Sequence, residues 1–177
     1  RQVTLGIQST YGQLYGPWII VSDPSGARDD TRENAPSARI CGLTSRIMDG
    51  GNHLSNGGKL LPGALDLTAR FSQQEYASLG AMQVNLITDR LNVGVRIGDD
   101  FTLSNGVNDP RKFGSVRRWL GYFKQSVESA LIEVVFSPAN KTLFADIDSA
   151  ITTFLLQEYN KGALFGNTPQ DAFQVII

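Results

Sequence analysis

A glycine-rich segment in the first half of this 177-residue chain contains residue types that could bind a phosphate group. Gly57-Gly58-Lys59 matches the last part of a phosphate-binding loop, in which backbone N–H groups and a lysine hold the phosphates. That loop also needs an earlier glycine, separated from the Gly-Lys pair by four residues, and a Ser or Thr directly after the lysine. This chain has His53 and Leu60 at those two positions. The segment therefore predicts a flexible glycine-rich turn and no nucleotide site.

Side chains that act as metal ligands or nucleophiles are scarce. Cys41 is the only cysteine and His53 the only histidine, which removes CxxC motifs, paired-histidine zinc motifs and an intrachain disulfide. Asp29-Asp30 and Asp99-Asp100 could each bind a hard cation, but neither pair has the ligand spacing of an EF-hand, and solvated turns explain both. We expect Cys41 to be a small core residue on a helix and His53 to lie in a surface loop. The sequence therefore predicts no catalytic residue, no metal site and no cofactor.

Composition and charge are those of a globular chain of about one domain. Hydrophobic residues make up 41% of it, and 16 Lys and Arg against 17 Asp and Glu give a formal net charge of −1. Nucleic-acid binding needs a basic excess, which this chain lacks. The longest apolar run, 130–136, is interrupted by Glu133 and is far shorter than the roughly 20 residues of a membrane span. We therefore expect one domain over 1–177, with 1–35 reaching the edge of a neighbouring, more variable domain, and neither nucleic acid nor a membrane as a partner.

The first two thirds of the sequence alternate between short apolar runs and turn residues, a pattern typical of a small sheet with short connections. Together with the end of the chain, these runs predict strands at 18–21, 64–71, 84–88, 91–97 and 173–177, and helices at 36–48 and 72–79. Ser72 and Glu75 have the spacing of a capping box, which satisfies two backbone N–H groups at a helix start. Polar residues 27–34 predict an exposed loop, and Asp89-Arg90 predicts a turn between two strands.

The last third predicts two long amphipathic helices. Apolar residues recur at intervals of three and four over 116–135, on one face of a helix that Ser115 can cap and Pro138 ends. A second stripe runs over 143–159, before Gly162. The short link predicts an antiparallel pair, and each stripe is expected to lie on the central sheet. The predicted fold class is α+β: a small mixed β-sheet packed against two long C-terminal antiparallel helices, plus shorter helices.

A basic cluster lies just before and along the first long helix. Its members are Arg111, Lys112, Arg117, Arg118 and Lys124. By spacing, Arg117, Lys124 and Glu128 fall on the helix face away from the apolar stripe. Two interpretations stay open for the cluster: a solvated helix face, and an electrostatic docking surface for an acidic partner protein.

Three segments of the last third resemble the C-terminal domain of the contractile tail sheath proteins of tailed phages. They are Val-Arg-Arg-Trp-Leu-Gly-Tyr at 116–122, Val-Val-Phe-Ser-Pro-Ala-Asn at 134–140, and the segment 159–173 that begins Tyr-Asn-Lys-Gly-Ala-Leu-Phe-Gly. Tyr15-Gly16-Pro17-Trp18 and Asp23-Pro24 are similar to the family's aromatic-Pro-Trp strand and Asp-Pro turn. The chain departs from the family pattern at 98–102, where Gly-Asp-Asp-Phe-Thr replaces the usual Gly-Ala-Arg-Thr.

The resemblance implies a structural subunit without catalytic activity, which assembles around an inner tube and contracts to drive the tube through a host envelope. It implies neighbouring sheath subunits, the tube protein, and the baseplate and tail terminator proteins as partners. It implies a location in the tail sheath of a virion, after assembly in the cytoplasm of a host bacterium, and a giant myophage is one candidate source. The chain would be the core of a longer protein, monomeric or weakly associating by itself, because the terminal arms that link subunits are expected to lie outside it.

Relatives hold an acidic tube surface with a basic helix of this domain, so the resemblance makes Arg117, Arg118 and Lys124 candidate contacts with the tube or with other subunits. Arg118 neighbours the apolar stripe, and an internal ion pair is the alternative role for it. Two other functions stay open. One is a sheath subunit of a related contractile machine, such as a bacteriocin-like particle or a secretion system. The other is an unrecognised enzyme, which would need a concave site with a strongly perturbed acid or lysine.

Overall fold

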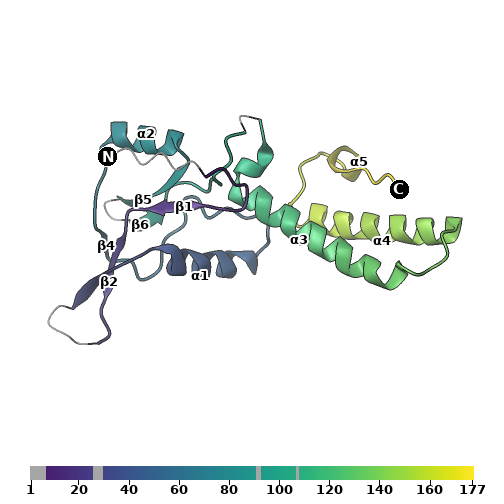
Figure 1. Ribbon diagram of the computed structural model, residues 1–177, viewed down its shortest axis with the longest axis horizontal. Helices are drawn as coiled ribbons and strands as arrows, with labels where there is room; N and C mark the ends of the chain where they lie inside the picture. Colours follow the sequence, from purple (N-terminus) through teal and green to yellow (C-terminus); the bar gives the residue numbers. More distant parts are fainter. Residues whose placement is uncertain (1–6, 26–29, 91–92, 107) are drawn as a thin grey trace.

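The computed structural model describes residues 7–25, 30–90, 93–106 and 108–177 (Figure 1). Its strands are β1 (Leu14–Gly16), β2 (Ile19–Ser22), β3 (Thr31–Asn34), β4 (Asp66–Leu67), β5 (Val84–Arg90) and β6 (Gly94–Ile97). Its helices are α1 (Ser37–Met48), α2 (Gln73–Ala81), α3 (Gly114–Leu131), α4 (Lys141–Asn160) and α5 (Pro169–Ala172), with 3-10 turns at Pro110–Lys112 and Ile132–Val134. The predicted α+β class is confirmed. None of the described helices is long and apolar enough to cross a membrane.

The strands form two three-stranded sheets. In one, β5 lies between β1 and β6, parallel to β1 and antiparallel to β6. In the other, β2 lies between β3 and β4 and is antiparallel to both. The predicted strand at 64–71 is reduced to the two residues of β4.

Two sequence predictions about connections are wrong. The polar segment 27–34 contains strand β3, whose register with β2 pairs Arg32 with Val21; residues 27–29 lie outside the described residues. Asp89 and Arg90 continue β5 and pair with β6 rather than forming a turn, and residues 91–92 are also outside the described part. In both places the hydrogen bonds of a neighbouring strand outweigh the turn preference of polar residues.

The hydrophobic core joins both sheets to α1. Ile19 of β2, Ile87 of β5 and Ile97 of β6 are each at most 1% exposed, and Ile40 and Leu43 of α1 belong to the same cluster. Side chains in β2 alternate between buried and more exposed positions, as expected for a strand with one face toward the core. We call the two sheets with α1 and α2 the sheet body.

Local sequence signals set the ends of α2 and α4. The Glu75 carboxylate accepts from the Ser72 N–H at 2.9 Å, and Ser72 Oγ accepts from the Glu75 N–H at 3.4 Å, so the predicted capping box is confirmed. Asn140 Oδ1 accepts from the Leu143 N–H at 2.9 Å at the start of α4. Gly162, with a φ of +78°, follows the end of α4, where a left-handed residue commonly terminates a helix.

Helices α3 and α4 run antiparallel, as predicted, but they extend away from the sheet body (Figure 1). The core cluster includes α1 and, among the described residues, no side chain of α3 or α4. The expectation that both apolar stripes lie on the sheet is therefore wrong. The stripes face each other instead, with the rings of Tyr122 and Phe123 at 5.7 and 6.0 Å from that of Phe154, centroid to centroid. We call α3 and α4 the helical hairpin.

Two details at helix ends also differ from the predictions. Ser115 lies inside α3, whose N-cap is Phe113 without a side-chain cap. Residues 173–177 follow α5 and start in an extended conformation, with Phe173 at φ −155° and ψ 158°. They are no strand here, because a strand needs a hydrogen-bonded neighbour and none of the described strands pairs with them.

Candidate functional site

Arg118 lies where α3 meets the sheet body, and it forms an ion pair with Asp100. Its Nη2 lies 3.0 Å from Asp100 Oδ2 and its Nη1 lies 3.4 Å from Oδ1, so the guanidinium contacts both carboxylate oxygens. Nη2 also donates to the carbonyl oxygen of Leu54 at 2.8 Å. The side chains of Arg118 and Asp100 are 16% and 4% exposed. This ion pair is therefore largely withdrawn from water, unlike a surface pair, whose energy solvent would screen.

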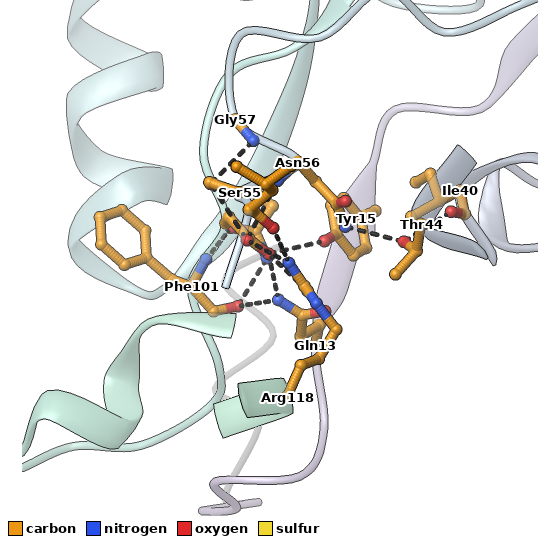
Figure 2. Close-up of polar contacts among 12 residues, drawn as sticks. Gln13, Tyr15, Ile40, Thr44, Ser55, Asn56, Gly57, Phe101 and Arg118 are labelled. Carbon is orange, nitrogen blue, oxygen red and sulfur yellow. Dashed lines mark hydrogen bonds and ion pairs between the residues drawn. The ribbon is translucent and has the colours of Figure 1, made fainter. Parts of the chain in front are cut away.

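The Asp100 carboxylate accepts further hydrogen bonds from two other segments. Oδ1 accepts from Gln13 Nε2 at 2.7 Å and lies 3.5 Å from the Tyr15 hydroxyl. Oδ2 accepts from Ser55 Oγ at 3.1 Å and from the Asn56 N–H at 3.2 Å. Figure 2 shows these side chains converging from separate parts of the chain. We call this group the polar junction: Gln13, Tyr15, Ser55, Asn56, Asp100 and Arg118.

The polar junction connects segments that are far apart in the sequence. They are the chain around β1, the loop between α1 and β4, the segment after β6, and α3. Asn56, which is fully buried, extends the contacts to α1 because its Nδ2 donates to Thr44 Oγ1 at 2.8 Å. One carboxylate thus attaches the helical hairpin to the sheet body.

Gly114 allows α3 to begin directly beside Asp100. The Gly114 N–H donates to the backbone carbonyl of Asp100 at 2.7 Å. A Cβ atom at this position would clash with Gln13 Nε2 and with Asp100 Oδ1, so any side chain here would displace the polar junction. The carboxylate also lies close to the N-terminal end of α3, where the helix dipole favours negative charge.

The environment of the polar junction shifts two pKa values in opposite directions. Burial by itself would raise the pKa of Asp100, but the hydrogen bond and positive charge of Arg118, with the donors Gln13 and Asn56, outweigh it and hold that pKa below its usual value. Burial raises the pKa of Tyr15 to about 12, and the negative charge of Asp100 adds to that rise. At neutral pH the polar junction therefore contains the charged pair of Arg118 and Asp100 and the neutral phenol of Tyr15. The hydrogen bonds of these three side chains hold separate backbone segments in place.

A second buried acid holds the two helices of the hairpin together. Glu158 of α4 is 3% exposed. Its Oε2 accepts from Trp119 Nε1 of α3 at 3.1 Å, and its Oε1 accepts from Lys161 Nζ at 2.7 Å. The Trp119 ring also stacks on Phe123, with 5.6 Å between their centroids. The end of the hairpin near the sheet body is therefore fixed by both polar and aromatic contacts.

The structure gives the three predicted contact residues different surroundings. Arg118 is internal, in agreement with the alternative role of an ion-pair partner. The guanidinium carbon of Arg117 lies 3.7 Å from the ring centroid of Tyr11, a side chain that is 82% exposed. Lys124 Nζ lies 3.5 Å from Glu128 Oε1, and these side chains are 74% and 64% exposed. Of the three cations, Lys124 presents its charge most openly to solvent.

None of the other residues that the sequence singled out for metal, nucleophile or phosphate chemistry hydrogen-bonds to the side chains of Arg118 or Asp100 in the described part of the chain, although Cys41 lines the same pocket as Arg118. Cys41 is exposed on α1, so the expectation of a core position is wrong, because Ile40 and Leu43 form the buried face of that helix. His53 lies half-buried in the loop after α1. The glycine-rich segment contains a turn, as predicted, with Gly58 at a φ of +75°.

The acidic pairs do not gather into a cation site in the described part of the chain. Asp100 binds Arg118, and Asp99 Oδ2 accepts from the Tyr76 hydroxyl at 3.1 Å. Asp29 lies outside the described residues. Among the residues that are described, no group of three or more His, Cys, Asp or Glu side chains could hold a metal ion. Sequence reasoning missed the role of Asp100 as the partner of Arg118. Two signals for it were present: the acidic pair Asp99-Asp100 in the segment where the chain departs from the sheath motif, and the position of Arg118 next to the apolar stripe.

No protein-family model matches this chain, and no curated protein matches its sequence. Solved structures do match. A chain of the contracted sheath complex of PVC, an extracellular contractile injection system, aligns with a TM-score of 0.83 and 20% identity, over 94% of this chain and 45% of that chain. A chain of the contracted helical sheath of the anti-feeding prophage aligns with a TM-score of 0.80 and 23% identity, over 93% of this chain and 44% of that chain. This chain has the fold of the contractile sheath proteins.

The sheath fold extends to a more distant neighbour. The crystal structure of the sheath tail protein from Desulfitobacterium hafniense aligns with a TM-score of 0.67 and 15% identity, over 86% of this chain and 36% of that chain. The chain thus spans less than half the length of each of these neighbours. The resemblance that the sequence indicated is confirmed at the level of the fold, and it includes the sheet body as well as the last third.

Removing the arginine of the polar junction should destabilise the sheath fold strongly. In Arg118→Met, the Asp100 carboxylate would stay buried without its cation, a change that typically costs about 3–5 kcal/mol. Urea denaturation followed by tryptophan fluorescence measures the loss. Lys124→Met is the matched control, because its ion pair is exposed and screened by solvent. Equal unfolding midpoints for the two variants would show that the ion pair does not hold the hairpin to the sheet body.

The lowered pKa of Asp100 also predicts a pH dependence. Because the folded-state pKa lies below the unfolded value of about 3.9, the ionised carboxylate stabilises the fold above about pH 4, and this contribution is lost as the pH falls through the folded pKa. Asp100→Asn should therefore lower the free energy of unfolding at neutral pH. It should also make that free energy fall less steeply as the pH drops from about 5 to about 2. Denaturation at a series of pH values measures the slope. Asp148→Asn, at an exposed position of α4, should keep the wild-type slope.

Proposed function

We propose that this chain is the core of a structural subunit of a contractile sheath, which surrounds an inner tube and contracts to drive it through a host envelope. The observation that carries the proposal is the shared fold over 94% of the chain with a protein of a contracted sheath complex. The motifs of the last third, found independently in the sequence, support the same assignment.

The particle we propose is a phage tail, with the sheath as the location of the protein and the host bacterial cytoplasm as its place of assembly. The proposed partners are neighbouring sheath subunits, the tube protein, and the baseplate and tail terminator proteins. A related contractile injection machine is the second candidate, because the PVC and anti-feeding prophage chains align with TM-scores of 0.83 and 0.80, above the 0.67 of the sheath tail protein. The genes that surround this one distinguish the two particles.

The proposed role needs no reaction at this chain. Contraction of a sheath converts one set of subunit contacts into another, and stiff subunits transmit such a change because packed cores resist continuous deformation. The polar junction suits this role, since Arg118 and Asp100 tie the helical hairpin to the sheet body. We infer that the hairpin and the sheet body move as one unit, and that the chain by itself is monomeric or weakly associating.

Among the basic residues, we propose Lys124 as the leading contact with an acidic tube surface. Its side chain is 74% exposed, and its ion pair with Glu128 is too solvated to compete strongly with a partner carboxylate. Arg117 is a weaker candidate because it stacks on Tyr11, and the charge of Arg118 is already matched by Asp100.

Electron microscopy of the complete protein that contains this chain tests the proposed function. When it is expressed in bacteria and purified, we expect tubes with a helical surface lattice, because sheath subunits polymerise through repeated contacts. The same preparation with Arg118→Met should give few or no tubes, since the hairpin would lose its attachment to the sheet body. A complete protein that stays monomeric at high concentration, with native stability, would contradict the sheath assignment.

Charge reversal at Lys124 tests the proposed tube contact. Lys124→Glu should weaken co-sedimentation with the tube protein and reduce the salt dependence of that binding, because one attractive charge becomes repulsive. Lys141→Glu, at an exposed position at the start of α4, is the matched control and should bind like the wild type. Unchanged binding and unchanged salt dependence for Lys124→Glu would remove this residue from the contact surface.

A further inference from the structure

An apolar groove lies between the outer parts of α3 and α4, beyond the contacts of Phe154 with Tyr122 and Phe123. Its volume is about 300 Å³, and Asp146 is its one charged lining residue. The main apolar lining residues are Val127, Ala130, Leu131, Leu143, Ile147 and Ile151. The hairpin extends away from the sheet body (Figure 1), and every residue that lines the groove belongs to α3, α4 or the 3-10 turn Ile132–Val134.

An aromatic side chain protrudes from the opposite end of the hairpin. Phe165, in the loop between α4 and α5, is 99% exposed. The loop around it is braced: the Tyr159 hydroxyl donates to the Gly166 carbonyl at 3.2 Å, and the Ala163 N–H donates to the Glu158 carbonyl at 3.0 Å. Gly166 packs so closely on Ala172 that a Cβ would lie 2.8 Å from the alanine methyl group. The fold therefore presents the Phe165 ring to solvent on a well-supported loop.

The groove and the protruding ring cannot meet within one chain. The α4 residues that line the groove run from Leu143 to Phe154, whereas Phe165 follows the C-terminal end of that helix. The six residue steps from Phe154 to Asn160 alone separate the two features by about 9 Å along the helix. A recess and a protrusion at different places on one molecule, when they bind each other, form head-to-tail contacts, which build rings or open helical arrays rather than two-fold dimers.

We propose that the apolar groove between α3 and α4 receives Phe165 of a second copy of this chain. The inference deepens the proposed function and rests on it, because a head-to-tail contact repeats along a helical lattice. A buried aromatic ring contributes roughly 150–250 Å² of contact, against the 1,200–2,000 Å² of a stable interface. The contact is therefore weak between two free copies and becomes effective when a lattice supplies further contacts.

A second fully exposed aromatic residue provides a control. Phe136 is also 99% exposed, but it follows Val134, which lines the groove, at the turn of the hairpin. Together with Ile132 and Val135, which are 69% and 65% exposed, it extends the rim of the same apolar surface. Phe136 therefore lies at the rim of the receiving groove, and its substitution is the matched control for that of Phe165.

The test uses the 177-residue chain and variants that remove one side of the contact each. Phe165→Ser removes the ring, and Ala130→Arg, at an exposed position of α3, places a charge at the groove. Amide chemical shifts of ¹⁵N-labelled protein are followed from about 0.02 to 1 mM, the range in which a millimolar contact becomes visible. We expect concentration-dependent shifts at Ala150 and Ile151 in the wild type, and association at least tenfold weaker in either variant alone.

Mixing the two variants gives the decisive result. Labelled Phe165→Ser, which keeps an intact groove, should regain the shifts at Ala150 and Ile151 when unlabelled Ala130→Arg, which keeps the ring, is added. Phe136→Ser should associate like the wild type. The dispersion of the same spectra reports folding, and Ala150→Arg replaces Ala130→Arg if that variant is unfolded.

Three results would overturn the proposed contact: no concentration dependence in the wild type, undiminished association in Phe165→Ser, or no recovery in the mixture. Loss of association in Phe136→Ser but not in Phe165→Ser would show that Phe136 makes the contact instead of Phe165, and it would overturn the proposal as well. These outcomes are distinct from failure of the sheath assignment, which appears as a complete protein that forms no tubes although the contact between copies is present.

Discussion

The ion pair between Arg118 and Asp100 is the interaction on which the arrangement of this chain depends. The hydrophobic core holds the two sheets and α1 together, but it contains no described side chain of α3 or α4. The hairpin is attached through the polar junction and through the start of α3, where Gly114 bonds to the backbone of Asp100. A buried charge without its partner is far more costly than a lost surface contact, so the two residues act as one unit.

An attachment of this kind has a consequence for packing. A hairpin that is held at one end leaves the outer parts of its apolar stripes without a covering layer, and the groove between α3 and α4 is the result. Within a single chain such a surface is unfavourable, since apolar side chains remain in contact with water. The contact proposed between two copies would cover part of this surface.

Some sequence signals were reliable because they act over a few residues. The capping box at Ser72 and Glu75, the period of the two long helices and the glycine after α4 were all predicted and are present. Predictions failed where a distant partner decided the outcome. Thr31–Asn34 are polar and read as a loop, but they pair with β2, and Cys41 lies on the exposed face of α1 because the sheets cover the opposite face. Propensity is a weak guide at such positions, since tertiary contacts outweigh it.

The sequence by itself determined the two long helices of the last third and the scarcity of residues with metal or nucleophilic chemistry. It also indicated the sheath fold through its motifs, because helix periodicity and turn residues are local properties of the chain. Only the tertiary structure decided the role of Arg118, the direction of the helical hairpin and the existence of the groove. Arg118 and Asp100 are 18 residues apart, and whether an arginine beside an apolar stripe faces a tube or a buried carboxylate depends on how separate segments fold together.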